Sequence, residues 1–163
     1  MKRTSFAVSL ALAVLAVLMF AGPVAAGENV PFRGTLEGIH TATGVPPIIT
    51  LLGGGTGHAT QLGNFTYDFP HTVNFVTQKV VGAYTFTAAN GDTLIADVVE
   101  GSSEPVEPGV IFVVEELVIT GGTGRFADAS GEITISRLVH QSNFSTTGSF
   151  EGRISSPGST NRN

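Results

Sequence analysis

Apolar and polar residues alternate with a period of two along most of the chain. Between residues 32 and 40, Phe32 and Leu36 fall on one parity while charged and hydroxyl residues fall on the other. The same alternation returns between residues 58 and 69, where it places Phe65, Tyr67 and Phe69 on one side. Side chains of a strand point alternately to its two faces, so both segments are predicted to be β-strands.

Proline and glycine punctuate these strands. Pro70 is predicted to end one strand, so that residues 71–77 form the next. Residues 46–52 begin with two prolines, which is typical of a short edge strand or an extended loop. The glycine-rich run at 53–57 is then expected to be a turn or a flexible loop. It lacks the Gly-Lys-Ser/Thr ending of a phosphate-binding loop, and no helix is predicted after it.

A β-hairpin is the strongest local prediction. The segments 80–89 and 92–100 are separated by Asn90-Gly91, a dipeptide that favours a two-residue type I′ turn. Residues 102–109 are polar and contain two prolines, so they are expected to form a loop. Residues 110–120 form the longest apolar run outside the N-terminal segment, and we expect a strand that is buried on both faces.

The C-terminal part continues the pattern. Gly121-Gly122-Thr123-Gly124 predicts a turn and residues 125–130 a single helical turn, followed by strands at 131–139 and 147–155. About eight strands without a longer helix predict an all-β domain, either a small antiparallel up-and-down barrel or a sandwich. Glycines inside the strands favour the closed barrel, because they relieve crowding where a small barrel bends.

The N-terminal segment has the organisation of a cleaved signal peptide. Lys2 and Arg3 precede an apolar run from Phe6 to Phe20, and small residues lead to a predicted cleavage site after Ala26. The run is shorter than the roughly 20 residues that span a bilayer. We therefore expect a signal peptide at 1–26, a barrel domain at 27–156 and a polar tail at 157–163, in a secreted or periplasmic protein.

Composition narrows the range of partners. The chain has no cysteine, so neither disulfides nor thiolate metal sites are expected. Its net charge of −5 becomes more negative when Lys2 and Arg3 are removed, which disfavours binding to nucleic acid. No membrane contact is expected after signal cleavage, and homo-oligomerisation is left open.

Three segments resemble the allene oxide cyclase-like and dirigent-like barrel family, in particular its secreted bacterial members. These are GDTLIAD, VVEELVITGGTGRFADASGEITISR and TGSFEGRIS, and they centre on the GGTGRF sequence at 121–126. The resemblance implies an eight-stranded barrel with an apolar cavity and without a metal or organic cofactor. The family's activities are diverse, and no set of its catalytic residues matches this chain residue by residue.

Two adjacent glutamates are the first candidates for chemistry. Glu115 and Glu116 lie in the apolar run at 110–120, so one of them must point into the interior. Burial raises the pKa of an unpaired carboxyl group, which would suit a general acid or base. Alternatively, the inward carboxylate is paired with Arg125 or with Arg137, which shares the parity of Ile133 and Ile135. Glu115 shares its face with the larger aliphatic set and is predicted to be the inward one.

Other polar residues are weaker candidates. Tyr67 and Tyr84 fall on apolar parity, where they are either core residues or hydrogen-bond donors to a ligand. The four histidines stand near predicted strand ends without zinc-ligand spacing, so no metal site is predicted. These are His40, His58, His71 and His140.

Three functions follow from these features. The first is a binding protein that holds a small apolar molecule in a cavity lined by Tyr67, Tyr84, Glu115 and Arg137. The second is a cofactor-free cyclase or isomerase that uses Glu115 or Glu116. The third is a structural or surface-interaction protein, which would have a solid core and associate through an uncovered edge strand.

Overall fold

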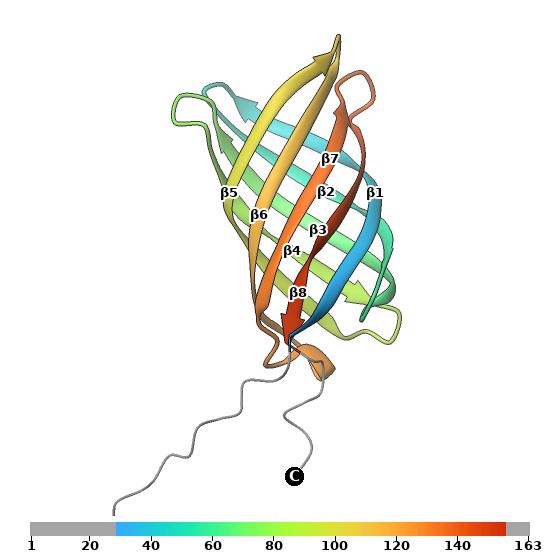
Figure 1. Ribbon diagram of the computed structural model, residues 1–163. Helices are drawn as coiled ribbons and strands as arrows, with labels where there is room; N and C mark the ends of the chain where they lie inside the picture. Colours follow the sequence, from blue (N-terminus) through green and yellow to red (C-terminus); the bar gives the residue numbers. More distant parts are fainter. Residues whose placement is uncertain (1–28, 156–163) are drawn as a thin grey trace, which may run out of the picture.

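A computed structural model describes residues 29–155, and these residues form a closed antiparallel barrel of eight strands. Consecutive strands pair with each other, and β1 pairs with β8 to close the sheet (Figure 1). The strands are β1 (Asn29–Val45), β2 (Ile48–Ala59), β3 (Gly63–Asn74), β4 (Lys79–Ala88), β5 (Thr93–Glu107), β6 (Val110–Gly122), β7 (Gly131–His140) and β8 (Ser145–Ser155). The up-and-down barrel predicted from strand alternation is confirmed, and the sandwich alternative is wrong.

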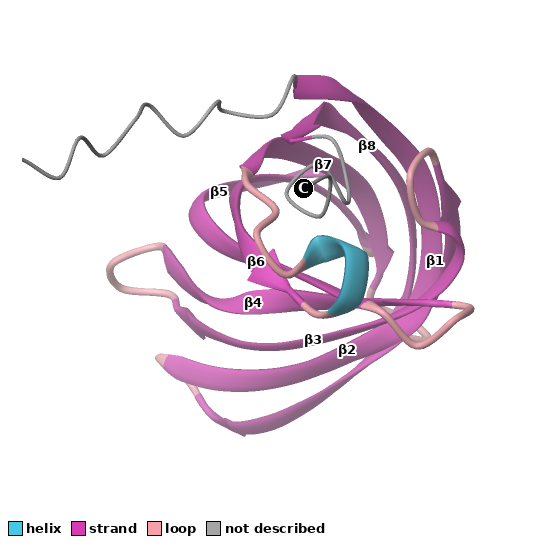
Figure 2. Cartoon of the chain, turned by 90° about the horizontal axis from the view of Figure 1, so that it is seen from below, coloured by secondary structure: helices cyan, strands magenta, loops and turns pink. Residues whose placement is uncertain are grey.

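One half of the barrel interior is filled with side chains. We call it the closed half, and it contains the β2–β3, β4–β5 and β6–β7 connections. Phe86 lies there between Phe65 and Phe150, with ring centroids 5.4 and 5.8 Å away. The short helix η1 (Gly124–Phe126) lies across the end of this half (Figure 2), and its Phe126 is fully buried in the core.

The other half, which we call the open half, is hollow. It contains the connections β1–β2, β3–β4, β5–β6 and β7–β8. On β6, the inward residues Glu115, Leu117 and Ile119 are buried, whereas Ile111 and Val113 are only half-buried although they share the same parity. Inward side chains can remain accessible only where the interior is not filled.

The predicted hairpin is confirmed, but its turn is different. β4 pairs with β5, and Gly91 has a φ of 88°. Asn90 is not among the residues with positive φ, so the turn is not type I′. The Ala88 amide donates to the Asp92 carbonyl and the Gly91 amide to the Ala88 carbonyl, both at 2.9 Å. This pattern belongs to a three-residue hairpin loop that ends in a left-handed glycine.

The glycine-rich segment at 53–57 is not a loop. It lies inside β2, which runs without interruption from Ile48 to Ala59. Its three inward glycines sit opposite aromatic residues of β3, in the pairs Gly53–Phe69, Gly55–Tyr67 and Gly57–Phe65. A side chain at these positions would collide with its surroundings, so the glycines provide space for the aromatic core.

Three further strand predictions are corrected. Pro70 lies within β3 and does not end it, because the ladder between β3 and β4 is interrupted between Asp68 and His71. Residues 102–107, predicted as a loop, are the exposed end of β5. β6 is buried on one face only: Glu116 and Val118 point outward and are exposed. The predicted helical turn near 125–130 is present as η1.

Two parts of the predicted organisation fall outside the described residues. These are the signal peptide at 1–26 and the polar tail at 157–163. Within residues 29–155, the structure contains no helix of the length and apolar character that crossing a membrane requires.

Candidate functional site

Four polar side chains form the boundary between the filled and the hollow half of the interior. Each of them is buried, and the next inward residue on its strand toward the open end is half-buried or exposed. We call this group the floor cluster; it consists of His40 on β1, His71 on β3, Glu115 on β6 and Arg137 on β7. The strands thus bring together residues that lie far apart in the sequence.

A buried ion pair is the centre of the floor cluster. Arg137 donates from Nε to Glu115 Oε2 at 3.0 Å and from Nη2 to Glu115 Oε1 at 2.9 Å. Two parallel hydrogen bonds of this kind hold both side chains in a defined orientation and strengthen the ion pair. Tyr84 Oη donates to Glu115 Oε2 at 2.8 Å from the core side. The inward orientation of Glu115 and its pairing with Arg137, both expected from strand parity, are present in the structure.

The two histidines take part with defined ring nitrogens. His40 Nε2 lies 3.3 Å from Arg137 Nη1, which can only donate, so Nε2 accepts and Nδ1 carries the proton of the neutral ring. His71 Nδ1 lies 3.0 Å from the carbonyl oxygen of Phe69, which can only accept. Nδ1 of His71 therefore donates, and its Nε2 is the acceptor of the neutral ring.

Burial keeps both imidazoles neutral. It lowers the pKa of His40 to about 4, and the positive charge of Arg137 acts in the same direction. It also lowers the pKa of His71, against the opposing effect of the Phe69 carbonyl. At neutral pH the floor cluster therefore contains one positive charge, one negative charge and two neutral rings.

Each member of the floor cluster faces a glycine on a neighbouring strand. The pairs are His40–Gly53, His71–Gly82, Glu115–Gly101 and Arg137–Gly148. A Cβ atom at Gly53 would lie 2.8 Å from Cδ2 of His40, and one at Gly82 or Gly148 would lie 2.6 Å from Cβ of His71 or Arg137. Gly53, Gly82 and Gly148 thus make room for large polar side chains inside a narrow barrel, whereas a Cβ at Gly101 would meet only ordinary contacts.

An aromatic stack supports the floor cluster from below. The ring of Phe69 stacks on His71 at 3.9 Å and on Tyr84 at 3.7 Å, measured between ring centroids. The guanidinium carbon of Arg137 lies 5.8 Å from the centroid of the same Phe69 ring. These contacts limit the movement of the floor cluster and connect it to the packed core.

A cavity of about 520 Å³ extends from the floor cluster to the open end of the barrel. Aliphatic side chains form much of its wall, and Phe75 and Phe144 contribute from the β3–β4 and β7–β8 connections. Polar side chains also line it, namely Asn74, Gln78, Ser102, Ser103 and Gln141. Among residues 29–155, Glu115 and Arg137 are the only charged residues that line it. The site is therefore a largely apolar chamber with buried hydrogen-bonding groups at its inner end and further polar side chains on its wall.

The structure separates the predicted site residues into two groups. Glu115 and Arg137 line the cavity, whereas Tyr67 and Tyr84 are buried below it and do not contribute to its wall. The Tyr67 hydroxyl is enclosed without a hydrogen-bond partner among the residues that the structure describes, and burial raises its pKa to about 12. Burial and the nearby Glu115 carboxylate also raise the pKa of Tyr84. Glu116 points outward and is exposed.

The predicted placement of the histidines is wrong for two of them. His40 and His71 lie inside β1 and β3 and not near strand ends, with ring centroids 5.9 Å apart. Sequence parity agrees with an inward orientation, because His40 follows Phe32 and Leu36 at steps of four. His58 lies on the outer wall, and His140 ends β7. Within residues 29–155, no three His, Cys, Asp or Glu side chains are arranged to hold a metal ion.

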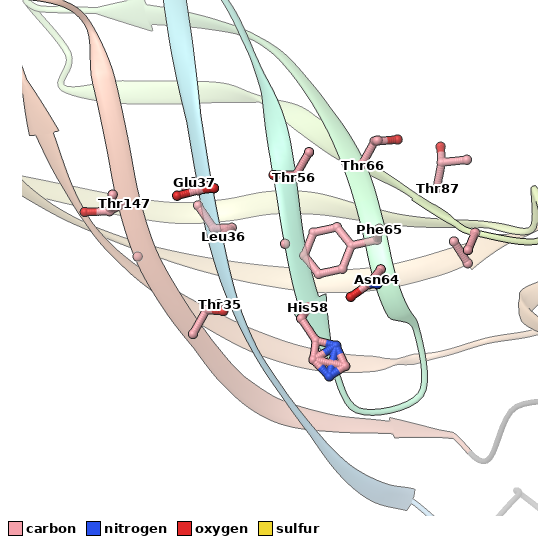
Figure 3. Close-up of a pocket in the computed structure, with 14 residues that line it drawn as sticks. Thr35, Leu36, Glu37, Thr56, His58, Asn64, Phe65, Thr66, Thr87 and Thr147 are labelled. Atoms are coloured by element: carbon pink, nitrogen blue, oxygen red, sulfur yellow. The ribbon is translucent and has the colours of Figure 1, made fainter.

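Two other hollows lie on the outer wall of the barrel. One spreads over β8, β1, β2, β3 and β4 and is lined mainly by threonines, together with Glu37, His58 and Asn64 (Figure 3). The other lies over β5 to β8 and includes Glu116. Most of the polar side chains of both are exposed, and neither contains a buried hydrogen-bonded group such as the floor cluster.

Comparison with known protein families, curated proteins and solved structures finds no match to this chain. The resemblance to the allene oxide cyclase-like family stays an expectation from the sequence. A closed barrel by itself does not define a function, so the functional argument depends on the cavity and its floor.

Proposed function

We propose that this barrel is an exported binding protein that holds one small, mainly apolar molecule in the cavity of its open half. The observation that carries the proposal is the cavity itself: about 520 Å³ with a largely apolar wall above a buried polar floor. Binding sites for small molecules typically combine an apolar lining with a few fixed polar groups. Small eight-stranded barrels are often filled by their own side chains, so a hollow half is a specific feature.

The distribution of exposed apolar residues supports entry at the open end. Large exposed hydrophobic side chains lie in each of the four connections of the open half or within two residues of it: Val45 and Ile48, Phe75 and Val76, Val106, and Phe144. None of the three connections of the closed half, all of them described, carries one. An apolar rim around the mouth lowers the cost of transferring an apolar molecule from water into the cavity.

The isomerase alternative has less support at the level of residues. It requires an inward carboxylate that is free to act as acid or base. Glu115 instead accepts hydrogen bonds from Arg137 and Tyr84, and Glu116 lies outside the cavity. The structural alternative requires an uncovered edge strand, whereas β1 and β8 pair with each other.

Binding of a neutral fluorescent dye, N-phenyl-1-naphthylamine, tests the proposal. Wild-type protein should enhance its emission saturably with one site per chain. Gly101→Leu should abolish this signal, because a Cβ at Gly101 fits at 3.6 Å from Val80 and the longer side chain extends into the cavity. Val99→Leu, an exposed substitution on the same strand, is the matched control and should bind normally.

Absence of dye binding to the wild type would contradict a ligand-binding function. Equal binding to wild type and Gly101→Leu would show that the dye binds elsewhere. Urea denaturation of both variants would establish that loss of binding does not come from unfolding.

A further inference from the structure

The charge balance of the floor cluster restricts which molecules the cavity accepts. Glu115 and Arg137 are 1% and 5% exposed and neutralise each other at 2.9 Å. No other residue in the described part of the chain that carries a formal charge at neutral pH lines the cavity. A ligand that reaches the floor therefore meets no net charge.

The floor nevertheless has unused hydrogen-bonding capacity. A guanidinium group carries five N–H donors, and Arg137 uses three of them on Glu115 and His40. Nε2 of His71 is an acceptor without a partner among the described residues. The floor cluster therefore offers both donors and an acceptor to an oxygen-bearing head group.

An ionised head group is disfavoured at this position. A carboxylate placed on the floor would add a negative charge that nothing compensates, because Glu115 already neutralises Arg137. Moving an uncompensated charge out of water is far more costly than moving a hydroxyl or a carbonyl that finds hydrogen bonds. The carboxylate of Glu115 thus disfavours the binding of a ligand that carries a second carboxylate.

We infer that the ligand has an apolar body and an uncharged oxygen-bearing head group, a hydroxyl or a ketone, and that Glu115 is the residue that excludes ionised acids. The inference rests on the proposed function and makes it more specific. It assigns the apolar body to the aliphatic walls and the head group to the floor cluster. Glu115 determines specificity through Arg137, whose charge it neutralises, without chemistry of its own.

Competition with the bound dye at about pH 8 tests the inference, with three probes that share one chain length: decanol, 2-decanone and decanoate. The wild type should bind the alcohol and the ketone at least tenfold more tightly than the acid. Glu115→Gln keeps the shape of the side chain and leaves Arg137 uncompensated, so the order should reverse in favour of decanoate. Glu116→Gln removes the same charge from the outer face and should bind as the wild type does.

A double variant distinguishes the effect of charge from a structural effect of the single substitution. Glu115→Gln combined with Arg137→Gln again has a neutral floor and should restore the preference for decanol and 2-decanone. Wild-type protein that binds decanoate as tightly as decanol would overturn the inference but leave the proposed function intact. Reversal in Glu116→Gln to the same extent as in Glu115→Gln would also overturn it. Failure of the dye and of all three probes to bind the wild type would instead refute the proposed function.

Discussion

The closed and the open half of this barrel are made from the same eight strands, yet their interiors differ. In the closed half, Phe65, Phe86 and Phe150 are buried and pack against one another, with Phe65 and Phe86 edge to face. In the open half, the inward residues Val73, Val113 and Val139 border a cavity. From this comparison we expect the packed closed half to contribute most of the free energy of unfolding. The open half can then contain a cavity at little cost to that free energy. Four predictions test this division, from the largest expected effect to the smallest.

Removal of a core ring should have the largest effect. Phe86→Ala in the closed half is expected to lower the free energy of unfolding by about 3–5 kcal/mol, because Phe86 is fully buried among other rings. Val113→Ala, on the cavity wall, should cost less than about 1 kcal/mol, since this side chain is only half-buried. Urea denaturation measures both. Similar losses in the two variants would contradict the division into a filled and a hollow half.

Breaking the ion pair of the floor cluster should have the second-largest effect on the free energy of unfolding. Arg137→Met leaves Glu115 buried without its cation and is expected to cost about 3 kcal/mol. The double variant Arg137→Met with Glu115→Leu should recover much of this loss, because the desolvation cost disappears together with the attraction. Urea denaturation of the two single variants and the double variant gives the coupling energy. Additive effects would mean that the pair does not act as a unit.

A fall in pH should lower the free energy of unfolding through protonation of His40. Its pKa is about 4 in the folded protein against 6.5 unfolded, so the unfolded chain binds more protons between these values. The stabilising contribution of neutral His40 is complete above pH 6.5 and is lost as the pH falls toward 4. Between about pH 7 and about pH 4.5, the wild type should lose about 2 kcal/mol more than His40→Gln does. Parallel pH profiles of the two proteins would show that His40 does not titrate in this way.

Two glycines should respond in opposite directions to the same substitution. Gly53→Ala places a Cβ 2.8 Å from the His40 ring and is expected to cost about 1 kcal/mol or more. Gly101→Ala places one at 3.6 Å from Val80, an ordinary contact, and should stabilise by about 0.5 kcal/mol through reduced freedom of the unfolded chain. Differential scanning calorimetry resolves the two shifts. A destabilised Gly101→Ala would show that the cavity wall is more tightly packed than described.

Strand alternation predicts the all-β domain, and the glycines inside its strands favour the barrel over the sandwich. Parity is a local property, and it places Arg137 on the apolar face of its strand. It leaves the choice between Glu115 and Glu116 open, and the larger aliphatic set on the face of Glu115 favours Glu115. The same signal is present for His71, which continues the parity of Phe65, Tyr67 and Phe69. It is hidden by Pro70, because a proline inside an alternating run is typical of a strand end. The proline is tolerated because the β3–β4 ladder is interrupted beside it.

The hollow half cannot be predicted in this way. Whether an inward side chain meets another one depends on the register of strands across the barrel, which alternation along one strand does not determine. The glycines carry part of this information. Gly53, Gly55 and Gly57 complement the large rings of β3, but without the register they resemble a flexible loop.

Closure of the barrel by β1 and β8 also has a consequence for how the chain folds. Asn29 and Ser155 are cross-strand partners although they stand at opposite limits of the described chain. Contacts between such distant residues bear the largest loop-closure entropy, so this ladder should form last and slow folding. Joining the two ends by a short linker and opening the chain at Asn90-Gly91 would make the same ladder local. The circularly permuted protein should then retain the barrel while a different pair of strands becomes the last to close.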